Sequence, residues 1–168
     1  TSEYGVGPST ALPAVQLPEA AAGTISDADV EAWLAAKLNA DDPAFAVPDA
    51  DTVYAIIYPT GLTISSGGSF SCQSFGGYHS NLALDANHAN KQVAYIVLPR
   101  CADFGPIHDI DAVTGALAHE LVEAATDPYP MTNPAWAQTD SAHIFWVRAL
   151  GGGETGDLCA QDPESFTV

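Results

Sequence analysis

The segment 118–128 carries the residues best suited to chemistry in this chain, in the pattern H-E-x-x-E. His119 and Glu123 are four residues apart, so an α-helix places both on one face, about one turn apart. In the H-E-x-x-H helix of zinc peptidases, two histidines at this spacing bind zinc, and the glutamate between them takes a proton from the water on the metal. Because zinc also accepts carboxylate oxygen, the pattern predicts His119 and Glu123 as metal ligands and Glu120 as the general base.

The residues around this motif predict a long, largely buried helix over about 110–125. Its apolar side chains follow the three- and four-residue spacing of a core stripe, namely Ile110, Val113, Leu117, Leu121 and Ala124. Asp109 or Asp111 is expected to cap its start, and Pro128 and Pro130 to enforce its end. The alternative, a solvated surface helix with one histidine, fits this stripe poorly. A buried His-Glu-Glu cluster needs a partner such as a metal ion.

A hydrolytic zinc site uses three protein ligands and keeps a fourth position open. We expect the third ligand to be Glu154, because a glutamate downstream of the helix pair serves this role in thermolysin-like peptidases. His79 ranks second, because the two glycines before it would let its loop approach the metal closely. Asp157 ranks third, and it could instead orient His119 by a hydrogen bond.

Other polar side chains have weaker claims on the site. Tyr78, His79 or Tyr129 could stabilise a tetrahedral oxyanion. Asp127 could bind the metal or a metal ligand, but an aspartate before proline at a helix end is usually a capping or turn residue. The remaining histidines lie outside any ligand spacing and are expected to be structural: His88, His108 and His143.

The charge balance limits the partners of the chain. Four Lys and Arg residues against 21 Asp and Glu give a net charge of −17, which disfavours binding to nucleic acid and anionic membranes. No apolar run approaches the roughly 20 residues of a membrane-spanning helix. The acidity suits solubility, and it permits calcium at a separate structural site. We expect a monomer that acts on a peptide or protein substrate.

Composition favours a secreted protein. Lysine is nearly absent, which removes cleavage points for trypsin-like proteases, and the loops are rich in Ser, Gly and Thr. No signal peptide begins at Thr1, so we expect that a leader was removed before this residue. Cys72, Cys101 and Cys159 fit one disulfide and one free thiol, with the pairing left open. The absence of a C-x-x-C pair argues against a cysteine zinc site.

The elements that must position these residues predict an α+β fold. A helix is expected from Ser26 onward, with an apolar stripe that consists of Val30, Leu34 and Leu38. Strongly β-favouring runs at 52–58 and 93–98 predict two central strands, and 143–148 a third. Helices and strands do not alternate regularly, so we expect one mixed sheet packed on the motif helix.

The other segments are interpreted as connections. Residues 1–24 predict an extended N-terminal arm, and 25–168 a single metal-binding domain. The Gly- and Ser-rich segment 60–81 is expected to be a long loop that contains His79. Residues 154–160, which follow three glycines, are expected to form a short helix or turn.

Several motifs occur in an order that resembles a family of secreted bacterial HExxE proteins, the zincin-like metallopeptidases with H-E-x-x-E-A-x-T-D-P and E-x-G-D-L-C segments. More distantly they resemble the plant EXORDIUM-like (phosphate-induced) cell-wall proteins. The matching blocks are Ser71-Cys72, Gly76 to Ser80, Tyr95 to Cys101, His119 to Pro128, Trp146 and Glu154 to Cys159. The resemblance covers roughly 50–160. It implies export and a zincin-like fold, and it adds weight to His79, Glu154 and Asp157; Thr155 stands where the family commonly has an aliphatic residue.

The sequence thus predicts a secreted zinc-dependent peptidase in which Glu120 activates the water on the metal. A glutamate ligand makes the metal a weaker Lewis acid, so we expect modest activity or a preference for Mn or Co. The alternative is a non-catalytic secreted module, like an EXORDIUM-like cell-wall or surface protein, in which the metal only holds the fold. A third interpretation is a calcium-stabilised adhesion or carbohydrate-binding module, permitted by the acidity and by the aromatic residues Trp33, Trp136 and Trp146.

Overall fold

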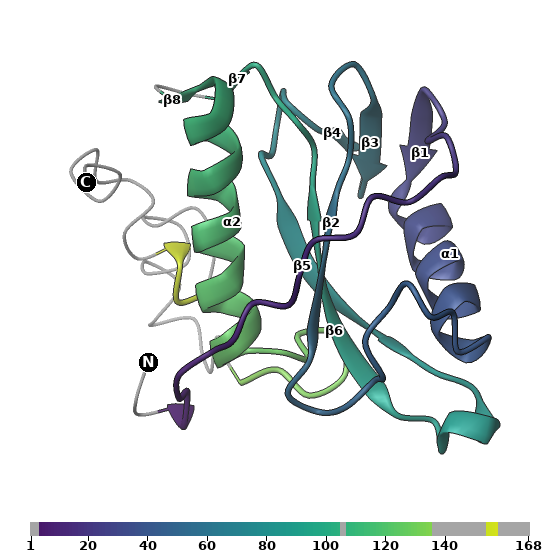
Figure 1. Ribbon diagram of the computed structural model, residues 1–168. Coiled ribbons are helices and arrows are strands. Elements are labelled where there is room, and N and C mark those ends of the chain that lie inside the picture. The colour runs from purple at the N-terminus through teal and green to yellow at the C-terminus, as the bar shows by residue number, and fades with distance from the viewer. Residues whose placement is uncertain (1–3, 105–106, 136–153, 158–168) are drawn as a thin grey trace.

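The computed structural model describes residues 4–104, 107–135 and 154–157. Two helices lie on opposite sides of a layer of strands (Figure 1). In chain order the elements are β1 (Thr24–Ser26), α1 (Asp27–Asn39), β2 (Val53–Ile57), β3 (Thr63–Ser66), β4 (Ser69–Phe70), β5 (Tyr78–Ala83), the 3-10 turn η2 (Ala86–His88), β6 (Gln92–Leu98), β7 (Asp103–Phe104), β8 (Ile107–His108) and α2 (Asp109–Thr126). The predicted α+β class and the long helix packed on mixed strands are confirmed.

The described strands form more than the single sheet that was expected. The main sheet has the order β2-β6-β5, with β2 parallel and β5 antiparallel to β6. A smaller sheet has the order β1-β3-β4, and β7 pairs with β8. The two strongly β-favouring runs became β2 and β6. Among the described strands β6 is central, whereas β2 lies at an edge of its sheet.

Strand β6 is buried on both faces, because α1 packs on one side of it and α2 on the other. Val93, Tyr95 and Val97 pack in one core cluster with the α1 stripe, as predicted from its spacing. Ile96 and Leu98 point the other way and pack with Ala124 of α2. The alternation of side chains along a strand separates the two cores, so a residue on β5 faces the helix that its partner on β6 faces.

Helix α1 begins with the local signal that the sequence predicts. The Ser26 side chain accepts a hydrogen bond from the Asp29 main-chain N–H, and the Asp29 carboxylate accepts one from the Ser26 N–H. This reciprocal capping box satisfies donors that the first helical turn leaves unpaired.

The predicted loop over 60–81 is wrong. This segment contains β3 and β4, and β5 begins at Tyr78, so His79 lies on a strand. Glycine, serine and the polar residues His79 and Asn81 hide the alternation expected of a strand. Those two polar side chains replace apolar residues on the face of β5 that α2 covers.

Helix α2 matches the predicted span but differs in its details. Its N-cap residue is His108, and no side chain caps it, so the expected capping by Asp109 or Asp111 is wrong. The stripe is also partly wrong, because Ile110 and Leu121 are 61% and 44% exposed. The buried face instead contains Ala112, Val113, Glu120, Glu123, Ala124 and Thr126. The helix is therefore rotated so that carboxylates, and not only apolar side chains, face the sheet.

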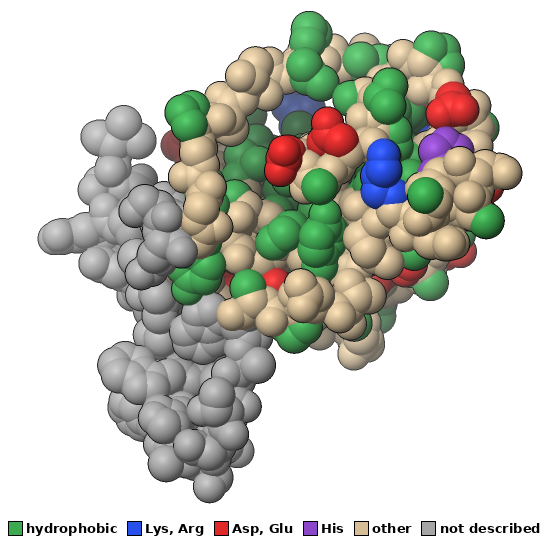
Figure 2. Space-filling model, turned by 90° about the horizontal axis from the view of Figure 1, so that it is seen from below, with side chains coloured by type: hydrophobic (Ala, Val, Ile, Leu, Met, Phe, Trp, Pro, Cys, Tyr) green, Lys and Arg blue, Asp and Glu red, His purple; other side chains and the backbone are tan. Residues whose placement is uncertain are grey.

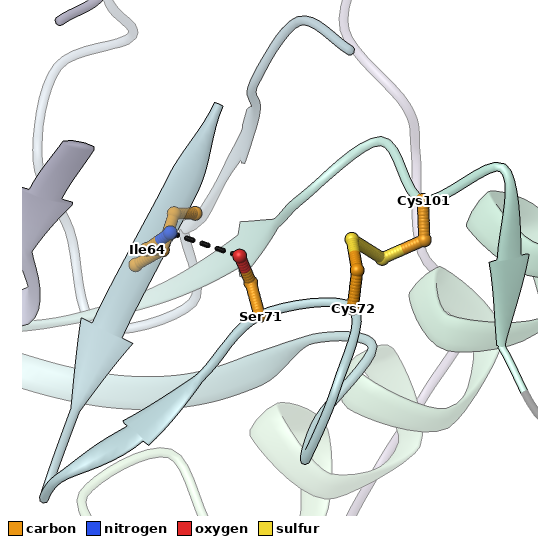
Figure 3. The surroundings of a disulfide bond; sticks show 4 residues. All are labelled: Ile64, Ser71, Cys72 and Cys101. Carbon is orange, nitrogen blue, oxygen red and sulfur yellow. Dashed lines mark hydrogen bonds between the residues drawn. A yellow bond between two sulfur atoms is a disulfide. The ribbon is translucent and has the colours of Figure 1, made fainter. Parts of the chain in front are cut away.

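A disulfide joins Cys72 to Cys101, which settles the pairing among the described cysteines (Figure 3). Beside it, the Ser71 hydroxyl accepts a hydrogen bond of 2.8 Å from the Ile64 N–H, and the Ser71 N–H donates to the Ile64 carbonyl. These bonds tie the segment that leads into β5 to β3 and to the end of β6. They restrain the chain shortly before His79.

Several expectations fall outside the described residues, among them the strand at 143–148, the glycine run 151–153 and the role of Cys159. Within the described part, no helix combines the length and hydrophobicity needed to cross a bilayer. Residues 5–23, within the predicted arm, contain no helix or strand. On the face in Figure 2, basic side chains are sparse, in keeping with the composition.

Removing the disulfide should lower the free energy of unfolding. The bond closes a sequence separation of 29 residues, and a loop of that length corresponds to about 3–4 kcal/mol of chain entropy in the unfolded state. We expect the Cys72→Ser/Cys101→Ser variant to lose this amount in urea denaturation, and the parent to match it in excess reductant. Equal stabilities under oxidising conditions would contradict this structural role.

Candidate metal centre

The centre of the site is Glu123, one of the least exposed charged residues described. It is 2% exposed and lies on the face of α2 that packs on the sheet. His119, one helical turn earlier, approaches it as the i, i+4 spacing predicts, with 3.1 Å between His119 Nε2 and Glu123 Oε1. Glu120 is also buried, at 5% exposure. The helix therefore presents two buried carboxylates and one partly exposed imidazole.

Strand β5 supplies a second imidazole from the opposite side. His79 is paired in register with Ile96, whose side chain faces α2, so the His79 ring also faces α2. Its Nδ1 lies 3.4 Å from Glu123 Oε2 and 3.6 Å from Glu120 Oε2. The sequence predicted His79 to lie on a loop. It lies on β5 instead, and the pleat of the strand directs its side chain toward α2.

The turn at 154–157 brings two more carboxylates. Asp157 Oδ1 lies 3.7 Å from His119 Nε2, and Glu154 Oε1 lies 3.7 Å from His79 Nε2. The Thr126 hydroxyl donates to the Thr155 hydroxyl at 3.2 Å, which joins this turn to the end of α2. The turn that was predicted to follow the glycine run therefore lies against the H-E-x-x-E helix.

Two sets of three ligand atoms result, each with all atoms within 4.8 Å of one another. We call His79, Glu120 and Glu123 the inner group, since all three are buried. We call His119, Glu123 and Asp157 the outer group, in which the histidine and aspartate are partly exposed. Glu123 belongs to both. No further group of three such side chains occurs among the described residues.

Two glycines allow this close packing. A Cβ atom on Gly156 would lie 2.8 Å from Glu123 Oε1 and 3.0 Å from His119 Nδ1. A Cβ atom on Gly77 would lie 3.1 Å from Glu120 Cγ. Sequence reasoning missed these contacts, although each glycine stands directly beside or within two residues of a predicted site residue.

The electrostatics of the cluster follow from its mixed charges. Burial alone would lower the pKa of His79, but the Glu120 and Glu123 carboxylates raise it to about 10. Burial likewise opposes the low pKa of Glu123, which the two histidines hold at about 2. Burial raises the pKa of Glu120, and it raises that of Glu154 to about 7. The Glu123 carboxylate, more than burial, determines the raised pKa of His119. The carboxylates of the cluster therefore favour a positive charge beside them.

One carboxylate oxygen of Glu123 lacks a hydrogen-bond partner in the described part of the protein. Glu123 Oε1 is buried and has no hydrogen-bond partner among the described residues, although His119 Nε2 lies 3.1 Å away. An unsatisfied buried carboxylate oxygen is costly. Imidazole nitrogen and carboxylate oxygen are zinc ligands, so the outer group fits a divalent cation at the point where its three ligand atoms converge.

The other predicted site residues lie elsewhere or act differently. Tyr78 faces α1, where its ring packs on Phe75 and its hydroxyl is buried, so the structure does not bring it to the cluster. The Tyr129 hydroxyl donates to the Ala50 carbonyl at 3.4 Å. The Asp127 carboxylate accepts a hydrogen bond from the Ala135 N–H at 2.8 Å, which suits the predicted turn role.

The two remaining described histidines pair with carboxylates away from the cluster. His88 lies beside Asp85 and Asp41, and His108 beside Asp103.

No protein-family model, curated protein or solved structure matches the chain.

Gly156→Ala should weaken metal binding without unfolding the protein. Its Cβ atom would displace the Glu123 carboxylate, and disturbing groups that orient a ligand typically costs 10–100-fold in metal affinity. Gly23→Ala is the matched control, because its Cβ atom would meet nothing within 4 Å. Isothermal titration with Zn²⁺ should show the loss in Gly156→Ala alone. Equal affinities for both variants would argue against Glu123 as a ligand.

Proposed function

We propose that this chain is a secreted zinc-dependent peptidase of zincin-like fold. The observation that carries the proposal is the orphaned, buried Glu123 Oε1 between His119 and Asp157. These three residues provide the three protein ligands of a hydrolytic zinc site. The side chains of His119 and Asp157 are each 22% exposed, against 3% for Glu123, so a substrate could approach from their side.

The donor set suggests which metals the site would accept. One imidazole and two carboxylates suit zinc, but they make a weaker Lewis acid than a set of histidines, and they also suit Mn²⁺ or Co²⁺. When bound, the ion would polarise the peptide carbonyl and make water more acidic. Glu154, 3.7 Å from His79, remains a candidate to replace Asp157 as a ligand.

Glu120 is the residue that we assign to proton transfer. It follows the ligand His119 directly and its carboxylate lies inside the cluster, where burial raises its pKa toward the range useful to a general base. In this role Glu120 accepts the proton of the attacking water and passes it to the leaving amine. A base of this kind typically contributes 10²–10⁴-fold to the rate.

His79 acts by holding Glu120. Its ring lies 3.6 Å from the Glu120 carboxylate, and its other nitrogen lies 3.1 Å from the Asp127 carbonyl oxygen. Both ring nitrogens therefore face acceptors, so neither points freely to an oxyanion. The imidazole fixes the position of the base and offsets its charge.

Export is part of the same proposal. The Cys72–Cys101 disulfide is typical of oxidising compartments, and the ordered motifs resemble those of secreted proteins. An acidic chain with few lysines would also resist trypsin-like proteases outside the cell.

The second candidate is a non-catalytic secreted module that a metal ion stabilises. It is favoured by the burial of the inner group, in which His79, Glu120 and Glu123 are each less than a tenth exposed. A structural ion needs no general base, so Glu120 separates the two candidates.

Glu120→Gln should abolish hydrolysis while the protein keeps its metal. With one equivalent of zinc supplied, we expect at least about 100-fold less cleavage of an unfolded protein substrate than for the parent, and the same amount of bound zinc by elemental analysis. Glu31→Gln, the same change at an exposed position of α1, should retain full activity. If the parent cleaves no unfolded substrate at one equivalent of zinc, the peptidase proposal fails and the structural module stands.

A further inference from the structure

The two oxygens of the Glu123 carboxylate face different groups. Oε1 lies 3.1 Å from His119 Nε2, in the outer group. Oε2 lies 3.4 Å from His79 Nδ1, in the inner group. A carboxylate in this position can bind one cation through each oxygen, as bridging carboxylates do in sites with two metal ions about 3.5–4 Å apart.

The inner group offers three ligand atoms of its own to a cation. His79 Nε2 lies 3.1 Å from the Asp127 carbonyl oxygen, and a carbonyl only accepts, so Nε2 carries the hydrogen. A cation held by Glu120 and Glu123 would displace the Nδ1 proton of His79, and the Nδ1 lone pair would then face it, 3.6 and 3.4 Å from the two carboxylates. Three electron-rich atoms thus converge in a buried place, and a ligand histidine typically donates its other N–H to a carbonyl in this way.

The charge of the whole cluster agrees with two divalent cations. When ionised, its carboxylates carry four negative charges, from Glu120, Glu123, Glu154 and Asp157. One divalent ion and a protonated His79 leave one of these charges uncompensated, whereas two divalent ions, the second replacing the His79 proton, balance all four.

We infer that the inner group binds a second divalent cation alongside the outer one, with Glu123 bridging the two, and that this second ion inhibits hydrolysis. The inference rests on the proposed function, in which the outer group holds the working ion. Glu120 is a ligand of the inner ion and the proton acceptor of the reaction. It cannot serve both roles at once, so filling the inner group removes the base.

Titration of the metal-free protein with Mn²⁺ tests this directly. We expect two equivalents to bind, and the electron paramagnetic resonance spectrum of the fully loaded parent to show an exchange-coupled Mn²⁺ pair. His79→Gln should bind one equivalent and show an uncoupled ion. Asp157→Asn should weaken binding of the ion in the outer group. His88→Gln is the matched control, because it removes a histidine that is paired with two carboxylates outside the cluster, and it should keep two coupled ions.

The activity of the parent gives the second readout. Hydrolysis should rise over the first equivalent and fall at least tenfold over the second. Binding of a single equivalent that His79→Gln retains and His119→Gln loses would overturn the second ion but leave the proposed function intact. Two bound ions without loss of hydrolysis would overturn the inhibition. No binding to the parent would overturn both, and because the coupled spectrum is read on the parent, a misfolded variant does not obscure the result.

Discussion

The burial of the Glu123 carboxylate between a helix and a sheet is the constraint on which the site depends. A charged group that is 2% exposed must be compensated. The compensation comes from two histidines, His119 on the same helix and His79 on β5. The turn at 154–157, which Gly156 allows to lie against the carboxylate, brings further negative charge. Even with these neighbours one oxygen lacks a hydrogen bond. A cation that binds both histidine and carboxylate would resolve this, and the proposed chemistry follows from where it would lie.

The rest of the fold serves to hold these three elements in register. Strand β6 is apolar on both faces, so it supports α1 on one side and α2 on the other. Strand β5 pairs with β6 in a register that sets His79 opposite Ile96 and thus toward α2. The disulfide and the Ser71–Ile64 hydrogen bonds fix the segment before β5. Apolar packing against both faces of β6 supports α2 and β5, in the way that a rigid scaffold positions a site for its ligand.

The helix motif could be predicted because its geometry is local: residues four apart in a helix must share a face, and His119 and Glu123 do. The contribution of His79 is not local. Its approach depends on the pairing of β5 with β6 and on the packing of α2, and its strand was hidden because polar residues occupy the face that α2 covers. The stripe on α2 was misjudged at Ile110 and Leu121, since apolar spacing alone does not reveal a helix rotated to bury carboxylates. Disulfide pairing likewise required the fold.

The central claim is that His119 and Glu123 together bind a divalent cation. A crystal structure of the zinc-loaded protein, with data collected on both sides of the zinc absorption edge, tests it most directly. We predict an anomalous peak about 2.0–2.2 Å from His119 Nε2 and from an oxygen of Glu123. A structure in which these two side chains hydrogen-bond to each other, with no anomalous peak between them, would contradict it.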